Sequence, residues 1–113
     1  MKVVILGAGK VGESLARNLS QDGYDVSLVD LDKSKIDYLQ DRLDVAAIVG
    51  HAAHPNSFKK CGADNETIVL AVTNNDEVNI AACQIAKAQF SVKKTICRFK
   101  DNTYLSCLCL LYT

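Results

Sequence analysis

The most constraining feature of the sequence is a regular alternation between two kinds of segment. Short runs rich in valine and isoleucine, bounded by turn residues, are typical of buried strands. These runs are Lys2–Leu6, Asp25–Val29, Val45–Val49, Thr67–Val72 and Thr95–Phe99. Stretches with apolar residues three and four positions apart lie between them and predict helices. The predicted helices are Lys10–Gln21, Lys33–Arg42, Pro55–Cys61 and Asp76–Phe90.

Strands that alternate with helices predict right-handed βαβ units. In such units helices cover both faces of a parallel sheet, which explains why the strand runs are apolar throughout rather than alternately polar. The sequence therefore predicts an α/β fold of the Rossmann type: a doubly wound parallel sheet of strand order 3-2-1-4-5 with helices on both faces.

Residues at the ends of the predicted helices agree with this arrangement. Pro55 suits the first position of a helix, and Gly62 suits the left-handed position that ends the same short helix. Asp76 is predicted to cap the long helix that it precedes.

Chain length limits the number of domains. The chain has 113 residues, enough for one domain but too few for a dinucleotide-binding domain and a substrate domain together. We expect one Rossmann-type domain over residues 1–100. Residues 101–113 form an apolar tail without glycine or a basic residue. It is either a final helix that packs on the sheet or part of an element whose partner lies outside this chain, and the second alternative predicts association.

Charge and cysteine content narrow the functional classes. Basic and acidic residues number 13 each, so no net field favours nucleic acid or an anionic membrane as a partner. No apolar window is long enough for a membrane span, and the N-terminal run is too short for a signal peptide. Five cysteines at irregular positions suit a reducing compartment better than a disulfide framework, which favours a cytoplasmic location.

A glycine motif follows the first predicted strand and opens the first predicted helix. Gly7-Ala8-Gly9-Lys10-Val11-Gly12 has the spacing G-x-G-x-x-G, in which the first glycine permits the tight turn, the second admits a pyrophosphate and the third lets helix and strand pack closely. Free backbone amides and the helix dipole would hold the phosphates. A glycine-rich turn without a ligand is the alternative.

Asp30 ends the second predicted strand, 18 positions after Gly12. A carboxylate at about this spacing accepts hydrogen bonds from the ribose hydroxyls of NAD. A 2′-phosphate would face this carboxylate, and the neighbours Leu31, Asp32 and Lys33 supply only one lysine, so NADP is disfavoured. The alternative is a solvated aspartate at the end of a strand.

Polar residues also follow the third and fourth predicted strands. Thr73 and Asn74 lie at the carboxyl edge of the sheet, where an open α/β sheet binds ligands, although turn and capping chemistry would explain them equally well. His51 and His54 match no established spacing of metal ligands, and neither do Cys107 and Cys109. We expect no metal site.

Five segments occur together that a generic dehydrogenase would not be expected to show. They are Ile5–Gly12, Val29–Asp30, Gly50–Pro55, Leu70–Glu77 and Asn79–Gln84. On these segments, residues 1–98 resemble the RCK/KTN domains, also called TrkA-N domains, which regulate bacterial potassium uptake. Residues 101–113 lack the sixth strand and crossover helix that the resemblance leads us to expect, which points to a truncated or altered end.

The resemblance implies a set of ligand-binding residues spread over the carboxyl edge of the sheet. The implied pyrophosphate group is Gly7, Ala8, Gly9, Lys10 and Val11, with Gly12 completing the motif. The implied adenosine group is Asp30 and Leu31 at the ribose and Gly50, His51 and Ala52 near the adenine. The remaining implied contacts are Thr73 and Asn74 on the distal half of the ligand and Arg98 on a phosphate or ribose.

The resemblance also implies a regulatory function. The family binds NAD(H) or ATP/ADP as a signal and passes a conformational change through a ring of regulatory domains to a membrane partner. We therefore expect an NAD(H)-binding regulatory domain in the cytoplasm, at the inner face of the membrane, whose partners are a potassium transporter membrane subunit and further copies of itself. ATP, ADP or AMP is the alternative ligand.

An enzyme is the competing class. An NAD-dependent oxidoreductase would need an acid or base near the nicotinamide and a substrate pocket. His51 is the only candidate near the crevice, and its expected place at the adenine end is wrong for hydride transfer. We therefore expect no catalytic activity.

Overall fold

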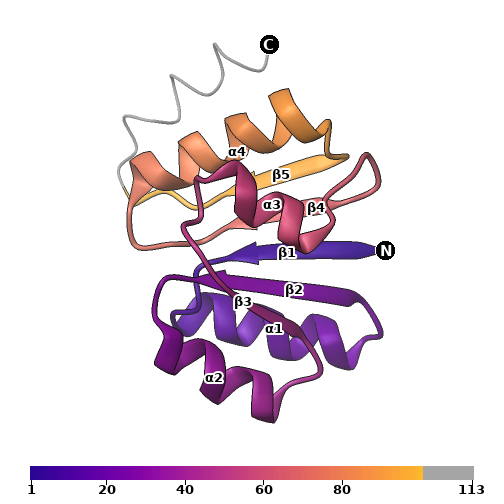
Figure 1. Ribbon diagram of the computed structural model, residues 1–113, viewed down its shortest axis with the longest axis vertical. Helices are drawn as coiled ribbons and strands as arrows, with labels where there is room; N and C mark the ends of the chain where they lie inside the picture. Colours follow the sequence, from indigo (N-terminus) through magenta and orange to yellow (C-terminus); the bar gives the residue numbers. More distant parts are fainter. Residues whose placement is uncertain (101–113) are drawn as a thin grey trace.

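The computed structural model describes residues 1–100, which form a five-stranded parallel sheet with helices on both faces (Figure 1). The strands are β1 (Lys2–Leu6), β2 (Asp25–Asp30), β3 (Ala46–Val49), β4 (Ile68–Ala71) and β5 (Lys94–Cys97). The helices are α1 (Lys10–Gln21), α2 (Lys33–Arg42), α3 (Pro55–Cys61) and α4 (Asp76–Phe90). The expectations for residues 101–113 lie outside the described residues.

The strand order is β3-β2-β1-β4-β5, as predicted. Central β1 pairs with β2 on one side and with β4 on the other, so that Ile5 lies opposite both Leu28 and Leu70. The chain therefore steps outward from β1 to β3, returns across the sheet, and steps outward again from β4 to β5. This reversal makes β1 and β4 neighbours whose connections leave in opposite directions.

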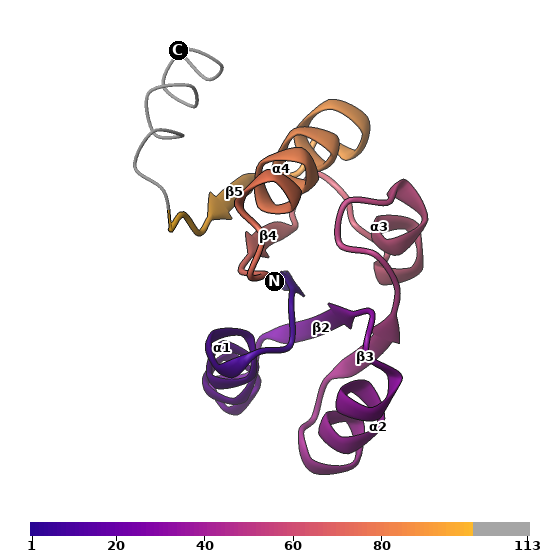
Figure 2. The ribbon, with the colours of Figure 1, turned by 90° about the vertical axis from the view of Figure 1, so that its left-hand side faces the viewer.

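The reversal also decides which face each helix covers, because right-handed crossovers in opposite directions lie on opposite faces. Figure 2 shows α1 and α2 on one face and α3 and α4 on the other. Successive residues of β1 point to opposite faces of the sheet and therefore pack in two different cores. Val3 and Ile5 pack with Leu28 on the α1 face, while Val4 and Leu6 pack with Phe58 on the α3 face.

The helix bounds match the predictions, whereas several strand bounds differ by one or two residues. β2 runs one residue further, because Asp30 pairs with Val49. β5 begins at Lys94, opposite Ile68, and ends at Cys97, opposite the last residue of β4. The predicted extension to Phe99 is wrong because, within residues 1–100, β5 pairs with β4 alone and this pairing stops where β4 ends.

The helix ends confirm two expected residues and correct a third. Pro55 is in the first turn of α3, and Gly62 ends that helix with a φ of 69°. Asp76 does not cap α4. The extended residue Asn75 is the N-cap, and its side chain accepts a hydrogen bond from the amide of Val78. Asp76 already has helical geometry, and its carboxylate accepts the amide of Lys100 instead.

Within residues 1–100, no helix covers the α1 face of the sheet near β5. A cavity of about 350 Å³ between α1 and β5 is lined by apolar side chains that include Leu15, Leu19, Leu70 and Ile96. Ile96 is 48% exposed, because no helix within residues 1–100 lies over it on this face. In the same residues, no helix is long and apolar enough to cross a membrane.

Candidate functional site

The candidate site lies at the carboxyl edge of the sheet, where β1 and β4 are neighbours. The connection after β1 enters α1 on one face and the connection after β4 enters α4 on the other (Figure 2). Open α/β sheets bind ligands in the crevice that such a reversal creates. The loops after β1, β2, β3 and β4 all reach this edge.

Two glycines of the motif are required by the packing of the loop itself. Gly7 has a φ of 110°, and a Cβ there would lie 3.0 Å from backbone atoms of Thr73 and Val72. A Cβ on Gly12 would clash with the carbonyl oxygen of Gly7. The Gly7 amide donates to the carbonyl of Val29 at 2.8 Å. These contacts hold the loop tightly between β2 and β4.

Gly9 differs from both, because a Cβ built there would meet no atom within 4 Å. Its φ of −75° is open to any residue. Gly9 is the N-cap of α1 and has no side chain to bond the first amides of the helix, which also lack intrahelical partners. The space beside Gly9 and these amides, at the positive end of the helix dipole, together suit a phosphate group.

Asp30 is fixed against the glycine loop. Its Oδ2 accepts the amide of Ala8 at 2.7 Å, and its Oδ1 accepts the amide of Asp32 at 2.8 Å. The half-buried carboxylate therefore stands at the junction of the β1 and β2 loops. Each oxygen keeps a further lone pair, which can accept a ribose hydroxyl.

The turn after β3 closes the adenine end of the predicted site. The Gly50 amide donates to the carbonyl of Asp30 at 3.0 Å, and a Cβ on Gly50 would lie 2.7 Å from the hydroxyl oxygen of buried Ser57. That hydroxyl donates to the carbonyl of His51. The exposed His51 ring accepts the amide of Ala53 through Nδ1. No three potential ligands within residues 1–100 are grouped to hold a metal ion.

The loop after β4 is organised by Asn79, a residue for which we predicted no role. Its fully buried side chain accepts hydrogen bonds from the Thr73 amide at 3.0 Å and the Thr73 hydroxyl at 2.6 Å. Its Nδ2 donates to the carbonyls of Thr73 and Arg98, both at 3.1 Å. The available signal was a polar residue on the apolar face of α4, in helical register with Ala82, Cys83 and Ala86.

Eight of the predicted site residues line one cavity of about 210 Å³. They are Gly7, Asp30, Leu31, Gly50, His51, Ala52, Thr73 and Asn74. Val29, Asn75 and Val78 complete its lining. The fold thus brings the ends of four strands together around one space, although their individual roles toward a ligand stay predictions.

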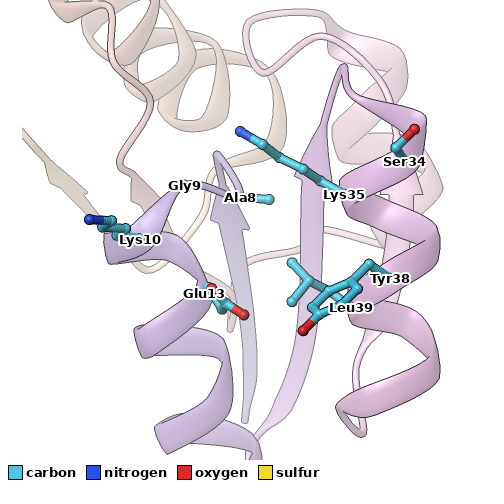
Figure 3. Close-up of a pocket in the computed structure, with 8 residues that line it drawn as sticks. All are labelled: Ala8, Gly9, Lys10, Glu13, Ser34, Lys35, Tyr38 and Leu39. Carbon is cyan, nitrogen blue, oxygen red and sulfur yellow. The ribbon is translucent and has the colours of Figure 1, made fainter.

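A second cavity, of about 450 Å³, lies on the other side of the glycine loop, between α1 and α2. Three predicted residues line it, Ala8, Gly9 and Lys10. Its other lining residues are Glu13, Ser34, Lys35, Tyr38 and Leu39 (Figure 3). We had predicted none of these five, because they come from helix faces rather than from strand ends.

Three predicted residues line neither cavity: Val11, Gly12 and Arg98. Val11 is 40% exposed in the first turn of α1. Arg98 follows β5, where its amide donates to the carbonyl of Ala71 and its carbonyl accepts from Asn79. A contact between the Arg98 side chain and a phosphate or ribose stays a prediction.

Comparison with known proteins identifies relatives over most of the chain. The TrkA-N domain family matches residues 3–111. The Trk system potassium uptake protein TrkA of Vibrio alginolyticus is 41% identical over 106 residues, which are 94% of this chain and 23% of that protein. The protein of the same name from Azorhizobium caulinodans is 42% identical over 105 residues, with 93% and 23% covered.

Two solved structures share the fold. The Shewanella denitrificans Kef CTD in its AMP-bound form has a TM-score of 0.72 at 20% identity and covers 100% of this chain and 83% of its own. A Bacillus halodurans xanthine dehydrogenase has a TM-score of 0.69 at 18% identity, with 92% and 30% covered.

The sequence relatives show the family, whereas the two solved structures, at 20% and 18% identity, show the fold alone. The relatives are named as potassium uptake proteins, and the chain spans about a quarter of their length. The family match covers nearly all of residues 1–100. This chain belongs to the TrkA-N domain family.

Proposed function

We propose that this chain is a nucleotide-sensing regulatory domain of a potassium uptake system, which binds NAD(H) in the crevice at the β1–β4 reversal. The observation that carries the proposal is the open space at Gly9 beside the fixed carboxylate of Asp30. A pyrophosphate at the start of α1 and a ribose at Asp30 would occupy adjacent positions. The adenine would enter the cavity beside His51.

An adenine mononucleotide, AMP, ADP or ATP, is the second candidate ligand. The features that support NAD(H) address its adenosine and pyrophosphate half, which these nucleotides share in whole or part. The Kef CTD, a protein of the same fold, was solved with AMP bound. We assign the distal half of the dinucleotide to Thr73 and Asn74, which line the same cavity as Gly7 and would have no partner in a mononucleotide.

We further propose how binding is communicated beyond the crevice. Thr73 lines the ligand cavity, and Asn79 joins Thr73 to the carbonyl of Arg98 after β5. A ligand that moves the Thr73 loop would therefore alter the position from which the chain continues past residue 100. A ligand can shift such an equilibrium only by its difference in affinity for the two states.

The proposed setting follows from the named relatives. We propose that the domain acts in the cytoplasm, at the inner face of the membrane, where it assembles with further copies and with a potassium transporter membrane subunit. No chemical transformation is part of this proposal. The likeness to a xanthine dehydrogenase concerns the fold alone.

Equilibrium binding tests the proposal. NADH, NAD, ATP, ADP and AMP would each be titrated into the purified chain, and we expect saturable one-site binding of at least one of them. Continuous assays of NADH absorbance with simple carbonyl and alcohol substrates serve as the control for the enzyme alternative. Sustained turnover that is lost in His51→Ala would contradict a purely regulatory function, and the absence of binding by every nucleotide would contradict the site.

A further inference from the structure

The cavity between α1 and α2 adjoins the proposed ribose position. Ala8 lines this cavity, and its amide is bonded to Oδ2 of Asp30 at 2.7 Å. Asp30 itself lines the neighbouring cavity. A ribose held by Asp30 therefore lies at the border of the two spaces. A group attached to its 2′-oxygen has room in the larger one, which measures about 450 Å³.

The order of charged residues at the start of α2 does not show which of their side chains face the ribose. Lys33, the lysine nearest to Asp30 in sequence, is paired with Asp37 at 2.7 Å and does not line the cavity. The carboxylate of Asp32 is turned toward its own helix, where it accepts the amides of Ser34 and Lys35 at 2.9 and 3.3 Å. Neither side chain is therefore directed at the ribose.

Lys35 is the available cation. Its side chain extends from α2 across the mouth of the cavity toward Ala8 and Gly9 (Figure 3). Within residues 1–100 it has no ion-pair partner, and the same holds for Lys10 on the α1 side. The acidic lining residue Glu13 is paired with Arg17 at 3.3 Å. The cavity mouth thus presents the unpaired ammonium group of Lys35, whereas the ends of the Lys10 and Ser34 side chains point away from it (Figure 3).

We propose that this cavity is an anion subsite for a phosphate on the 2′-oxygen of the bound adenosine, and that Lys35 is its specificity-determining residue. The inference rests on the proposed nucleotide site. In dinucleotide sites of this fold, a carboxylate on the ribose hydroxyls favours NAD, and a nearby cation accommodates the 2′-phosphate of NADP. This chain combines both elements, so its preference for the unphosphorylated nucleotide is weaker than Asp30 alone would give.

The test compares ligands that differ by one phosphate. NADH against NADPH, and 5′-AMP against 2′,5′-ADP, would be titrated into the full chain and into Lys35→Ala. We expect wild type to bind each phosphorylated ligand within about 10-fold of its partner, and Lys35→Ala to widen that ratio by about 5-fold, as the loss of one partly exposed charge pair implies.

Lys33→Ala is the matched control, because it removes the same charge from the same turn of α2 but outside the cavity. Its ratio should equal that of wild type. An unchanged ratio in Lys35→Ala, an equal change in Lys33→Ala, or NADH binding without detectable NADPH binding would each overturn the subsite while leaving the nucleotide site intact. Failure of every nucleotide to bind wild type would overturn both.

Discussion

Single residues of the glycine loop have separate tasks that the motif alone does not distinguish. Gly7 and Gly12 are required by contacts within the protein, because a Cβ at either position meets backbone atoms. A Cβ built on Gly9 meets no atom within 4 Å, so contacts within residues 1–100 do not explain why this position lacks a side chain. A ligand that occupies the empty space supplies one.

We expect Gly9→Val to abolish nucleotide binding while the protein stays folded. The valine methyl groups would fill the phosphate space, which we expect to weaken binding by about 100-fold or more, a cost of roughly 3 kcal/mol. The loss of a glycine N-cap should lower the unfolding free energy by only about 1 kcal/mol. Calorimetric titration and thermal unfolding of the variant measure the two effects.

Gly12→Ala provides the contrasting variant, since its Cβ would collide with the Gly7 carbonyl. It should lose several degrees of melting temperature whether or not nucleotide is present. A Gly9→Val protein that binds like wild type would show that the space beside Gly9 is not the phosphate position.

Asp30→Asn should weaken NADH binding about 10-fold, because a carboxamide replaces a charged acceptor of the ribose hydroxyls. The substitution also removes one acceptor for the amides of Ala8 and Asp32, so stability should fall by about 1 kcal/mol. Calorimetric titration of the variant measures the change in NADH affinity, and chemical unfolding measures the change in unfolding free energy. Unchanged NADH affinity would assign Asp30 to the loop alone.

At the residue scale, the sequence predicts positions whose backbone geometry the pattern fixes, while their roles toward a ligand stay predictions. Gly7, Gly9, Gly12 and Asp30 could be located from spacing, because a strand, a tight turn and a helix fix their positions. Lys35 could not, since its access to the cavity depends on which of the two nearby lysines is paired with Asp37. Side-chain geometry decides which lysine pairs with Asp37, and the sequence does not give that geometry.

Among the elements, α4 connects the ligand crevice to β5 through one buried side chain. Asn79 has no exposed surface and bonds both the Thr73 loop and the carbonyl of Arg98. Asn79→Ala would leave these backbone groups without their partner, and we expect a loss of roughly 2–4 kcal/mol in unfolding free energy. Urea unfolding of the variant measures it.

Gln84→Ala is the control on the same helix, because Gln84 is exposed. It should change stability by less than about 0.5 kcal/mol. Equal stability of the Asn79→Ala and Gln84→Ala proteins would contradict the linking role of Asn79.

The packing of α3 against the sheet predicts a pH dependence. Burial raises the pKa of the Cys61 thiol from 9.0 to about 11, with a hydrogen bond from Ser27 and the charge of Lys2 acting in the opposite direction. Because the folded-state pKa is the higher one, the stabilisation is complete below pH 9 and is lost as the pH rises toward 11. The loss should reach about 2–3 kcal/mol.

Chemical unfolding of wild type and Cys61→Ala between pH 8 and 11 checks this expectation. Titrating groups other than Cys61 affect the unfolding free energy of both proteins. The difference between the two slopes of unfolding free energy against pH therefore isolates the thiol. The same dependence of unfolding free energy on pH in both proteins would contradict the predicted contribution of Cys61.

Element-level prediction was most accurate for helices. The bounds of all four could be read from periodicity and end residues, because a helix satisfies its own backbone. Strand ends depend on the partner strand, which is why β5 stops at Cys97 opposite Ala71. The cap of α4 was misassigned by one residue because Asn75 and Asp76 are both good capping residues, and only their backbone angles decide between them.

For the whole molecule, we expect self-association. Ile96 and Tyr24 are 48% and 40% exposed beside the open α1 face, and parallel sheets normally have both faces covered. A second copy of this chain would cover this face and is the partner expected in the regulatory assembly. Size-exclusion chromatography with light scattering should show a dimer or larger species whose share grows with concentration. A monomer at every concentration would contradict the expectation.

Amide NMR during a nucleotide titration tests whether a nucleotide binds where the four strand ends meet. With NADH, we predict that the largest shifts fall on Gly9, Val11, Leu31, His51 and Thr73. With AMP, which lacks the distal half, the shift at Thr73 should be smaller. Gly9→Val should remove these shifts. Shifts confined to other surfaces, or no shift with any nucleotide at saturating concentration, would contradict nucleotide binding at this edge of the sheet.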